Sequence, residues 1–142
     1  MTNPSDGPKL SSQTKHDLID RVSLGIRSVT IVVGPTGCGK STLVPAALLD
    51  GLGGPVLCTQ PRRLAVVSVA NRVAHNRSVQ LGTEVGYHVG QHNESRNQTK
   101  ILFATAGILL EELRANGVAT LERYEAILID ECHERSPESD LC

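Results

Sequence analysis

The sequence predicts an α/β fold in which helices cover both faces of a mostly parallel sheet. Short apolar runs alternate along the chain with segments of helical periodicity, which is typical of βαβ units with right-handed crossovers. A glycine-rich loop joins the first apolar run, residues 29–33, to a helix-forming segment at 43–50. An Asp-Glu pair closes the last apolar run, at 126–130. The last two observations place polar residues at the end of a predicted strand.

Length and composition narrow the possible functions. A chain of 142 residues can form one domain with a substantial core, but not two. A net charge of −1 argues against a broad surface for polyanions, although it permits a local basic strip. The aromatic residues are Tyr87, Phe103 and Tyr124, so a surface that stacks bases on rings is not expected. Any nucleic-acid contact should therefore involve the backbone.

The remaining composition indicates an intracellular protein, cytoplasmic or nuclear. The four cysteines lack metal-type spacing, which favours reduced thiols over disulfides or zinc. No apolar run is long enough for a membrane span, and the polar start of the chain does not resemble a signal peptide. We expect residues 1–12 to be a disordered lead-in and residues 13–142 to form the domain, with no membrane partner.

The elements can be predicted in order from periodicity and turn signals. An amphipathic helix is expected at 13–25, and the β-branched run at 29–33 is expected to be a parallel strand buried on both faces. Pro45 should loosen the first turn of the next helix without ending it. The later strands are expected at 56–60, 85–89, 100–105 and 126–130, with a polar loop at 91–99. The later helices are expected at 62–75 and 106–115. The apolar stripe of the first would be Leu64, Val67, Ala70, Val73 and Ala74.

The glycine-rich loop matches the pattern G-x-x-x-x-G-K-[ST] and lies between a predicted strand and a predicted helix, as a phosphate-binding loop requires. It comprises Gly34, Pro35, Thr36, Gly37, Cys38, Gly39, Lys40, Ser41 and Thr42. Glycines allow successive N–H groups to point inward at phosphate oxygens, and the following helix adds its N-terminal partial charge. Lys40 can contact the β- and γ-phosphates, and the Ser41 hydroxyl can ligate Mg²⁺. We interpret this loop as a nucleotide-phosphate site.

Asp130 and Glu131 are the candidate second half of that site. They follow an apolar strand, and α/β sheets bind ligands at the carboxyl ends of their strands. Asp130 would hold Mg²⁺ opposite Ser41, and Glu131 would lie beside Asp130 in the metal site. Glu131 could also orient and deprotonate an attacking water. Taken alone, the pair is equally compatible with a solvated turn. Its position after a phosphate loop and intervening βα units favours the catalytic interpretation.

These motifs resemble those of superfamily 2 helicases. Residues 130–133 read Asp-Glu-Cys-His, the D-E-x-H form, and Glu134 and Arg135 extend the likeness to the DEAH-box/RHA group. Residues 34–42 resemble motif I, 59–63 (Thr-Gln-Pro-Arg-Arg) motif Ia, and 105–107 (Thr-Ala-Gly) motif Ib. Residues 84–90 resemble the V-G-Y segment between them. The nearest likeness is to plant helicases that also carry CCCH zinc fingers.

The sequence departs from the family pattern at three positions. Pro35 stands where many members have Glu, Ala106 where Asp is usual, and Cys132 where Ala is usual. None of the three substitutions removes a predicted phosphate or magnesium ligand.

The resemblance implies a three-layer P-loop NTPase fold of the RecA-like type, with ATP and Mg²⁺ as cofactors and RNA as partner. It assigns catalysis to Lys40, Asp130, Glu131 and His133, the last coupling the nucleotide site to RNA. Arg62, Arg63 and Thr105 would contact the RNA backbone without reading its sequence. Three structural alternatives remain: solvated arginines in a first helical turn, a Thr105 helix cap, and a hydrogen-bonded structural His133.

The resemblance also implies that the fold is incomplete. In the family, a strand with the S-A-T motif lies between the phosphate-loop strand and the strand that ends in the D-E-x-H residues, here 130–133. A second RecA-like domain supplies arginines to the γ-phosphate. Because both would follow residue 142, we expect a gap in the sheet and a segment that is poorly stable and nearly inactive alone.

Three functions fit this sequence. The first is an ATP-dependent RNA helicase, of which this segment is part. A viral-type D-E-C-H helicase fits residues 130–133 but does not explain Pro61, Arg62, Arg63 or the Glu134-Arg135 extension. A truncated, non-catalytic nucleotide- or RNA-binding module is the third possibility, distinguished by ATP binding without turnover.

Overall fold

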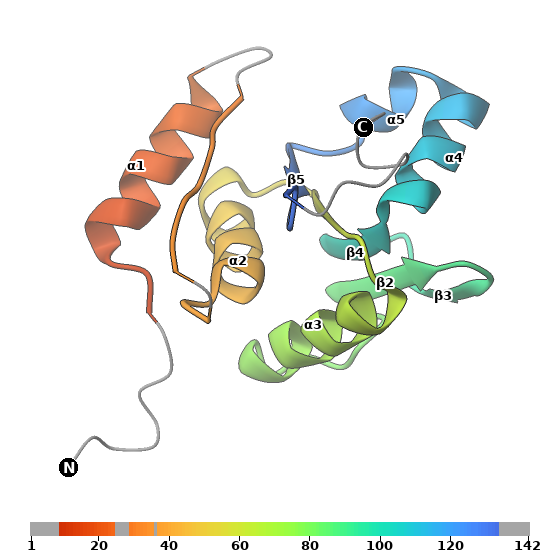
Figure 1. The fold of residues 1–142 in the computed structure, drawn as a ribbon, viewed down its shortest axis with the longest axis horizontal. Helices are drawn as coiled ribbons and strands as arrows, with labels where there is room; N and C mark the ends of the chain where they lie inside the picture. Colours follow the sequence, from red (N-terminus) through yellow and green to blue (C-terminus); the bar gives the residue numbers. More distant parts are fainter. Residues whose placement is uncertain (1–8, 25–28, 36, 134–142) are drawn as a thin grey trace.

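The computed structural model describes residues 9–24, 29–35 and 37–133 of the chain. The predicted lead-in at 1–12 lies mostly outside these residues, as do Thr36, Glu134 and Arg135. The elements are α1 (Ser12–Ser23), α2 (Lys40–Leu52), β1 (Val56–Gln60), α3 (Arg63–Asn76), β2 (Val85–Val89), β3 (His92–Glu94), β4 (Ile101–Thr105), α4 (Ala106–Asn116), α5 (Ala119–Glu122) and β5 (Ala126–Ile129) (Figure 1).

The strands form one mostly parallel sheet in the order β3-β2-β4-β1-β5. All neighbours are parallel except β2 and β3, which form an antiparallel hairpin. Val56 at the start of β1 pairs with Ile101 of β4 and Ala126 of β5, so these three strands begin in register. Their carboxyl ends therefore lie along one edge of the sheet, as expected for the α/β class.

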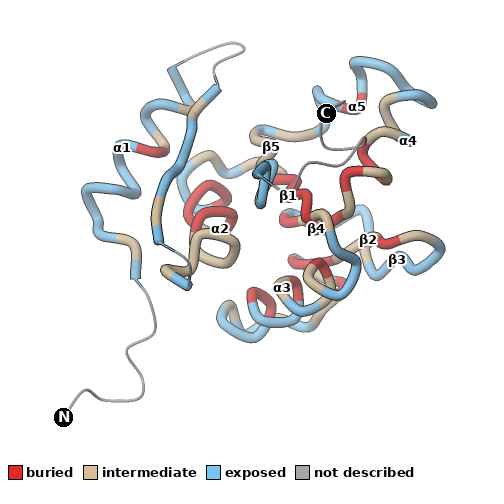
Figure 2. The backbone as a smooth tube through the Cα atoms, in the orientation of Figure 1, coloured by how far each residue is buried: buried red, intermediate tan, exposed pale blue. Residues whose placement is uncertain are grey.

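Helices cover both faces of the sheet. On one face, α2 and α3 pack against a cluster that includes Val56, Ile101 and Phe103, and α1 packs on α2; on the other, α4 packs against Leu57 and Ala104. Successive strand residues alternate between the two clusters, because side chains of a strand point to opposite faces. Because helices cover both faces of the sheet, every residue of β1 is buried (Figure 2).

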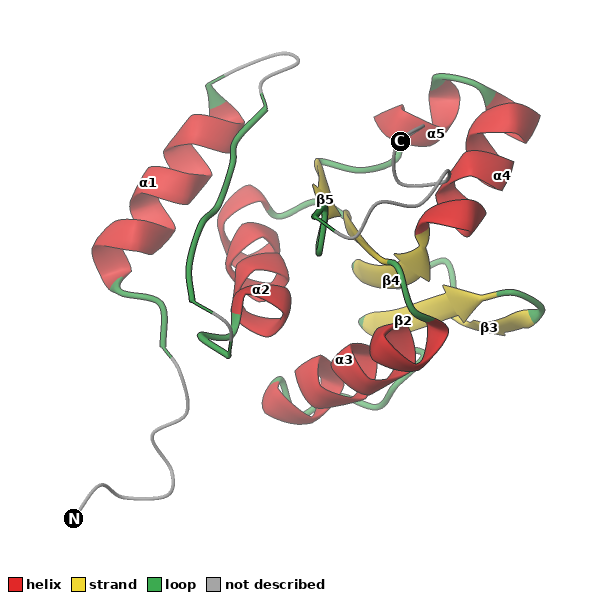
Figure 3. Cartoon of the chain, in the orientation of Figure 1, coloured by secondary structure: helices red, strands yellow, loops and turns green. Residues whose placement is uncertain are grey.

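The predicted strand at 29–33 is absent, and this is the main correction to the sequence analysis. Residues 29–35 form an extended loop between α1 and α2 (Figure 3). Val29, Ile31 and Val33 are 90%, 82% and 88% exposed. A strand requires a neighbour for its N–H and C=O groups, and within the described residues the sheet ends at β5, to which this segment is not paired. The expected gap between residues 29–33 and β5 stays a prediction, because 29–33 forms no strand that could lie on its far side.

Smaller differences concern the hairpin and one helix face. The predicted polar loop at 91–99 contains β3, because backbone pairing with β2 overrides its polar composition. Leu64, predicted in the apolar stripe of α3, is 86% exposed, and Val66 is buried in its place. The short helix α5 was not predicted. The other predicted helices and strands are confirmed within three residues at each end, and Pro45 lies inside α2.

No helix within the described part of the chain has the length and apolar character needed to cross a membrane.

Candidate nucleotide and magnesium site

The phosphate loop leads directly into the N-terminus of α2. Gly37 and Gly39 have φ values of +80° and +85°, a left-handed conformation that glycine adopts without steric cost. Gly39 is the N-cap of α2, and no side chain caps the helix. The Thr42 N–H donates to Gly39 O at 3.1 Å, but no side chain blocks the N-terminus of α2, where the helix dipole favours an anion. The described loop residues therefore have the backbone geometry that phosphate binding requires.

Lys40 folds back over its own loop. Its Nζ donates hydrogen bonds to the carbonyl oxygens of Gly34, at 2.6 Å, and Pro35, at 3.0 Å. Cys38 Sγ lies 3.6 Å from the same nitrogen. The ammonium group is therefore held beside the loop, where phosphate oxygens could take the place of the two carbonyls as partners.

Asp130 joins the two predicted halves of the site. Ser41 Oγ, on α2, donates a hydrogen bond to Asp130 Oδ2, although the two residues are 89 positions apart. Asp130 directly follows β5, and its backbone N–H donates to Thr59 O at 3.1 Å. The strand end and the start of α2 therefore meet at one place.

The Ser41 hydroxyl and the Asp130 carboxylate suit magnesium in their chemistry. Both present oxygen atoms, which Mg²⁺ prefers as ligands, and they are already in contact. Among the described residues, no three His, Cys, Asp or Glu side chains gather as a metal cage. Mg²⁺ suits such a sparse site, because it keeps several waters and binds through one or two protein groups plus substrate phosphates.

Glu131 has an unusual backbone conformation for a residue other than glycine. Its φ is +52°, in the left-handed region, where side chains are disfavoured. Its side chain is 44% exposed, and Oε2 lies 3.1 Å from Nε2 of the more exposed His133. Such local strain is often found at functional sites. The contact joins two residues of the predicted catalytic set, whereas the role of His133 in coupling stays a prediction.

Cys58, on β1, is buried and lies near the Asp130 carboxylate. Burial raises the pKa of its thiol, and the nearby negative charge of Asp130 raises the pKa further. The thiol therefore stays neutral and contributes to packing behind the site.

Gln60 is a site residue to which the sequence analysis gave no role. It is the last residue of β1, only 4% exposed, and its Nε2 donates to Asp130 Oδ2 at 2.5 Å. A polar side chain at the carboxyl end of an otherwise apolar strand was the available signal. It went unused because the contact joins residues 70 positions apart.

The predicted RNA-contacting residues lie along the same edge of the sheet. Thr105 pairs with Gln60 in the register of β4 and β1. Thr105 is the N-cap of α4, but its side chain makes no capping hydrogen bond, so the capping alternative is not supported. Arg62 and Arg63 are exposed at the start of α3.

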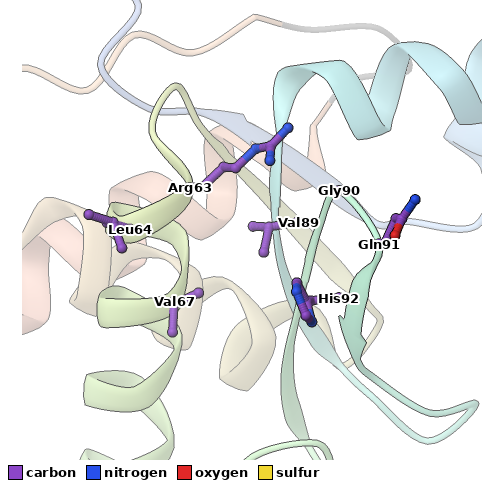
Figure 4. A pocket seen from close by; sticks show the side chains of 7 residues that line it. All are labelled: Arg63, Leu64, Val67, Val89, Gly90, Gln91 and His92. Atoms are coloured by element: carbon purple, nitrogen blue, oxygen red, sulfur yellow. The ribbon is translucent and has the colours of Figure 1, made fainter.

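Arg63 and the β2–β3 hairpin border a shallow pocket of about 460 Å³ (Figure 4). A β-carbon placed on Gly90, in the hairpin turn, would lie 3.5 Å from Nη1 of Arg63. The pocket lining is Arg63, Leu64 and Val67 from α3, and Val89, Gly90, Gln91 and His92 from the hairpin. The hairpin turn thus lies against an arginine that the sequence analysis assigned to RNA.

Comparison with known proteins identifies the family. The family model for the DEAD/DEAH box helicase matches residues 13–140. The chain is 53% identical over 116 residues to zinc finger CCCH domain-containing protein 4 of Oryza sativa subsp. japonica, covering 80% of this chain and 11% of that protein. It is 50% identical over 127 residues to the DExH-box ATP-dependent RNA helicase DExH8 of Arabidopsis thaliana, covering 89% of this chain and 12% of that protein.

A more distant relative agrees. The putative ATP-dependent RNA helicase DHX57 of Mus musculus is 42% identical over 124 residues, covering 82% of this chain and 9% of that protein. The chain thus spans about a tenth of the length of these curated relatives. The family match extends over nearly the whole chain and includes both halves of the site. The chain therefore belongs to the DEAD/DEAH box helicase family.

Proposed function

We propose that this chain forms the nucleotide-binding part of an ATP-dependent RNA helicase, in which ATP hydrolysis is coupled to RNA binding. The observation that carries the proposal is the hydrogen bond from Ser41 to Asp130, which unites the phosphate loop with the strand-end carboxylate. The relatives named as ATP-dependent RNA helicases support the choice of ATP and RNA.

The nucleotide would be bound mainly by the phosphate loop. Backbone N–H groups at the start of α2 would bind the phosphate oxygens, and Lys40 would place its charge on the β- and γ-phosphates. Ser41 and Asp130 would hold Mg²⁺, which when bound neutralises charge on the phosphates. Glu131 would take a proton from the attacking water, and its exposure leaves it accessible to that water.

RNA would bind along the edge of the sheet where β1 and β4 end. Arg62 and Arg63 are exposed there and can donate to phosphates, and the Thr105 hydroxyl lies at the end of β4. Contacts of this kind fix the position of a strand without reading its bases. The low aromatic content agrees with such backbone binding.

We expect full activity to require parts beyond this segment. A strand between residues 29–33 and β5, and a second RecA-like domain with arginines for the γ-phosphate, are what the family resemblance implies. Arginines of that kind contribute about 10³–10⁵ to the rate in comparable enzymes. An intracellular location, cytoplasmic or nuclear, also stays a prediction.

The test is to place Lys40→Ala and Glu131→Gln, separately, in the complete protein that carries this segment. Lys40→Ala should weaken ATP binding and lower RNA-stimulated hydrolysis at least about 100-fold, because a phosphate-binding charge is lost. Glu131→Gln should preserve ATP binding and slow hydrolysis by about 10²–10⁴, because a general base is lost.

Lys100→Ala and Glu122→Gln, both at exposed positions, are the matched controls and should leave hydrolysis unchanged. If hydrolysis survives both site substitutions, the assignment of the site is wrong. If the unmodified protein binds ATP without turning it over, the non-catalytic binding module is the better account.

A further inference from the structure

Gln60 connects two regions that the proposed function uses separately. Its side chain is buried at the carboxyl end of β1, and its amide nitrogen donates to Asp130 Oδ2 at 2.5 Å. Two residues further along the chain, Arg62 occupies the N-cap position of α3. One side-chain contact therefore lies between the arginine pair and the carboxylate of the magnesium site.

Within the part of the chain that the structure describes, the Asp130 carboxylate is oriented by three hydrogen bonds. Oδ2 accepts from both Ser41 Oγ and Gln60 Nε2, whereas Oδ1 accepts from the backbone N–H of Glu131 at 2.9 Å. Ser41 would also be a ligand of the metal, so it cannot serve as a fixed support. Gln60 is therefore the only one of the three donors that is a buried side chain outside the proposed ligand set.

The backbone around Gln60 is well placed to transmit a displacement. Gln60 is paired with Thr105 of β4, and the preceding Thr59 accepts the N–H of Asp130 at 3.1 Å. On the other side, Pro61 restricts the backbone between Gln60 and α3, because its ring fixes φ. A shift of the arginines on binding a polyanion would thus reach Gln60 through a short, stiff connection.

We propose that Gln60 is a positioning residue that orients Asp130 and couples polyanion binding at Arg62 and Arg63 to metal-nucleotide binding. This inference rests on the proposed function of the site. Because coupling between two binding sites is reciprocal, RNA and the metal-nucleotide complex should change each other's affinity by the same factor. Removing the Gln60 amide should reduce that factor.

The experiment uses Gln60→Met in the complete protein, since methionine keeps a similar length and lacks the amide donor. The probes are Mn²⁺, followed by electron paramagnetic resonance, a non-hydrolysable ATP analogue, and polyuridine. We expect Mn²⁺ affinity in the presence of the analogue to fall about 10-fold or more, as for other residues that orient metal ligands. Affinity for the metal-free analogue should stay within about 2-fold, because the Gln60 side chain makes its hydrogen bond to Asp130 and none to the described residues of the phosphate loop.

The coupling between polyuridine and the metal-bound analogue gives the second readout. In the unmodified protein polyuridine should change the affinity for the metal-bound analogue by about 5-fold or more, and in Gln60→Met that factor should approach one. Gln80→Met, at an exposed position, is the matched control and should change neither quantity. Gln60→Leu repeats the test if Gln60→Met does not fold.

Three results would overturn the inference. They are unchanged Mn²⁺ affinity and coupling in both folded Gln60 variants, an equal loss of metal-free and metal-bound affinity, and an absence of coupling in the unmodified protein. A failure of the unmodified protein to bind the analogue at all would instead contradict the proposed function. The two failures are therefore distinguishable.

Discussion

Two five-residue, mostly apolar segments of this chain adopt different structures, one a loop and the other a strand. Residues 29–33 read Val-Thr-Ile-Val-Val, and β1 reads Val-Leu-Cys-Thr-Gln. The first is the more β-branched, yet it is an exposed loop, whereas every residue of β1 is buried. The difference lies in neighbours, because β1 is paired on both sides, with β4 and β5. Strand propensity thus expresses fit to a sheet and does not create a strand alone.

The largest expected difference between the paired sheet and residues 29–33 is in how much a substitution lowers the free energy of unfolding. Phe103→Ala should lower the free energy of unfolding by about 3–5 kcal/mol, because the ring is fully buried in β4 and leaves a cavity. Ile31→Ala should change it by less than about 0.5 kcal/mol, because that side chain is 82% exposed. Urea denaturation of the chain measures both. Similar losses for the two variants would mean that residues 29–33 are packed in solution.

A pair of glycines offers a second contrast of intermediate size. A β-carbon on Gly86, in β2, would lie 2.4 Å from the backbone oxygen of Glu94, so Gly86→Ala should cost about 1–3 kcal/mol as the hairpin is pushed apart. A β-carbon on Gly37, in the phosphate loop, meets no atom within 4 Å among the described residues beyond its chain neighbours, so Gly37→Ala should cost about 1 kcal/mol from its left-handed backbone. Thermal denaturation of both variants checks this order, and a reversed order would contradict the pairing of β2 with β3.

The smallest expected effect is the pH dependence contributed by Tyr124. Burial raises the pKa of its hydroxyl, Glu112 raises the pKa further, and Arg123 lowers it. The folded state therefore holds this proton at a pH where the unfolded chain has begun to lose it. Its contribution to stability is complete below the unfolded pKa of about 10 and is lost as pH rises through the folded pKa.

Tyr124→Phe should accordingly reduce the decline of the unfolding free energy above about pH 10. Urea denaturation at several alkaline pH values measures this difference. The segment 29–35 contains no ionisable side chain, so it should contribute nothing to the pH dependence. An unchanged pH profile in Tyr124→Phe would show that the hydroxyl is as solvated in the folded state as in the unfolded one.

Most secondary structure followed from local patterns. The apolar runs that became β1, β2, β4 and β5 were recognisable from their own residues, and so were the helices that separate them. Both halves of the site were also predictable, because phosphate-loop spacing and a strand-end Asp-Glu pair have direct chemical meanings. In the structure the two segments meet through the hydrogen bond from Ser41 to Asp130.

The errors share one cause, which is dependence on distant neighbours. The hairpin strand β3 exists because β2 lies beside it, and the burial of Val66 in place of Leu64 depends on how α3 rests on the sheet. The contact of Gln60 with Asp130 joins two strands whose adjacency no local pattern reveals.

By itself the sequence determined the class of fold, the order of most elements and the chemistry of the phosphate loop and carboxylates. Only the tertiary structure decided which apolar runs became strands and which polar side chains met. The physical reason is that propensity, periodicity and capping act within a few residues. Strand pairing, burial and hydrogen bonds such as those to Asp130 depend on groups brought together from far apart in the chain.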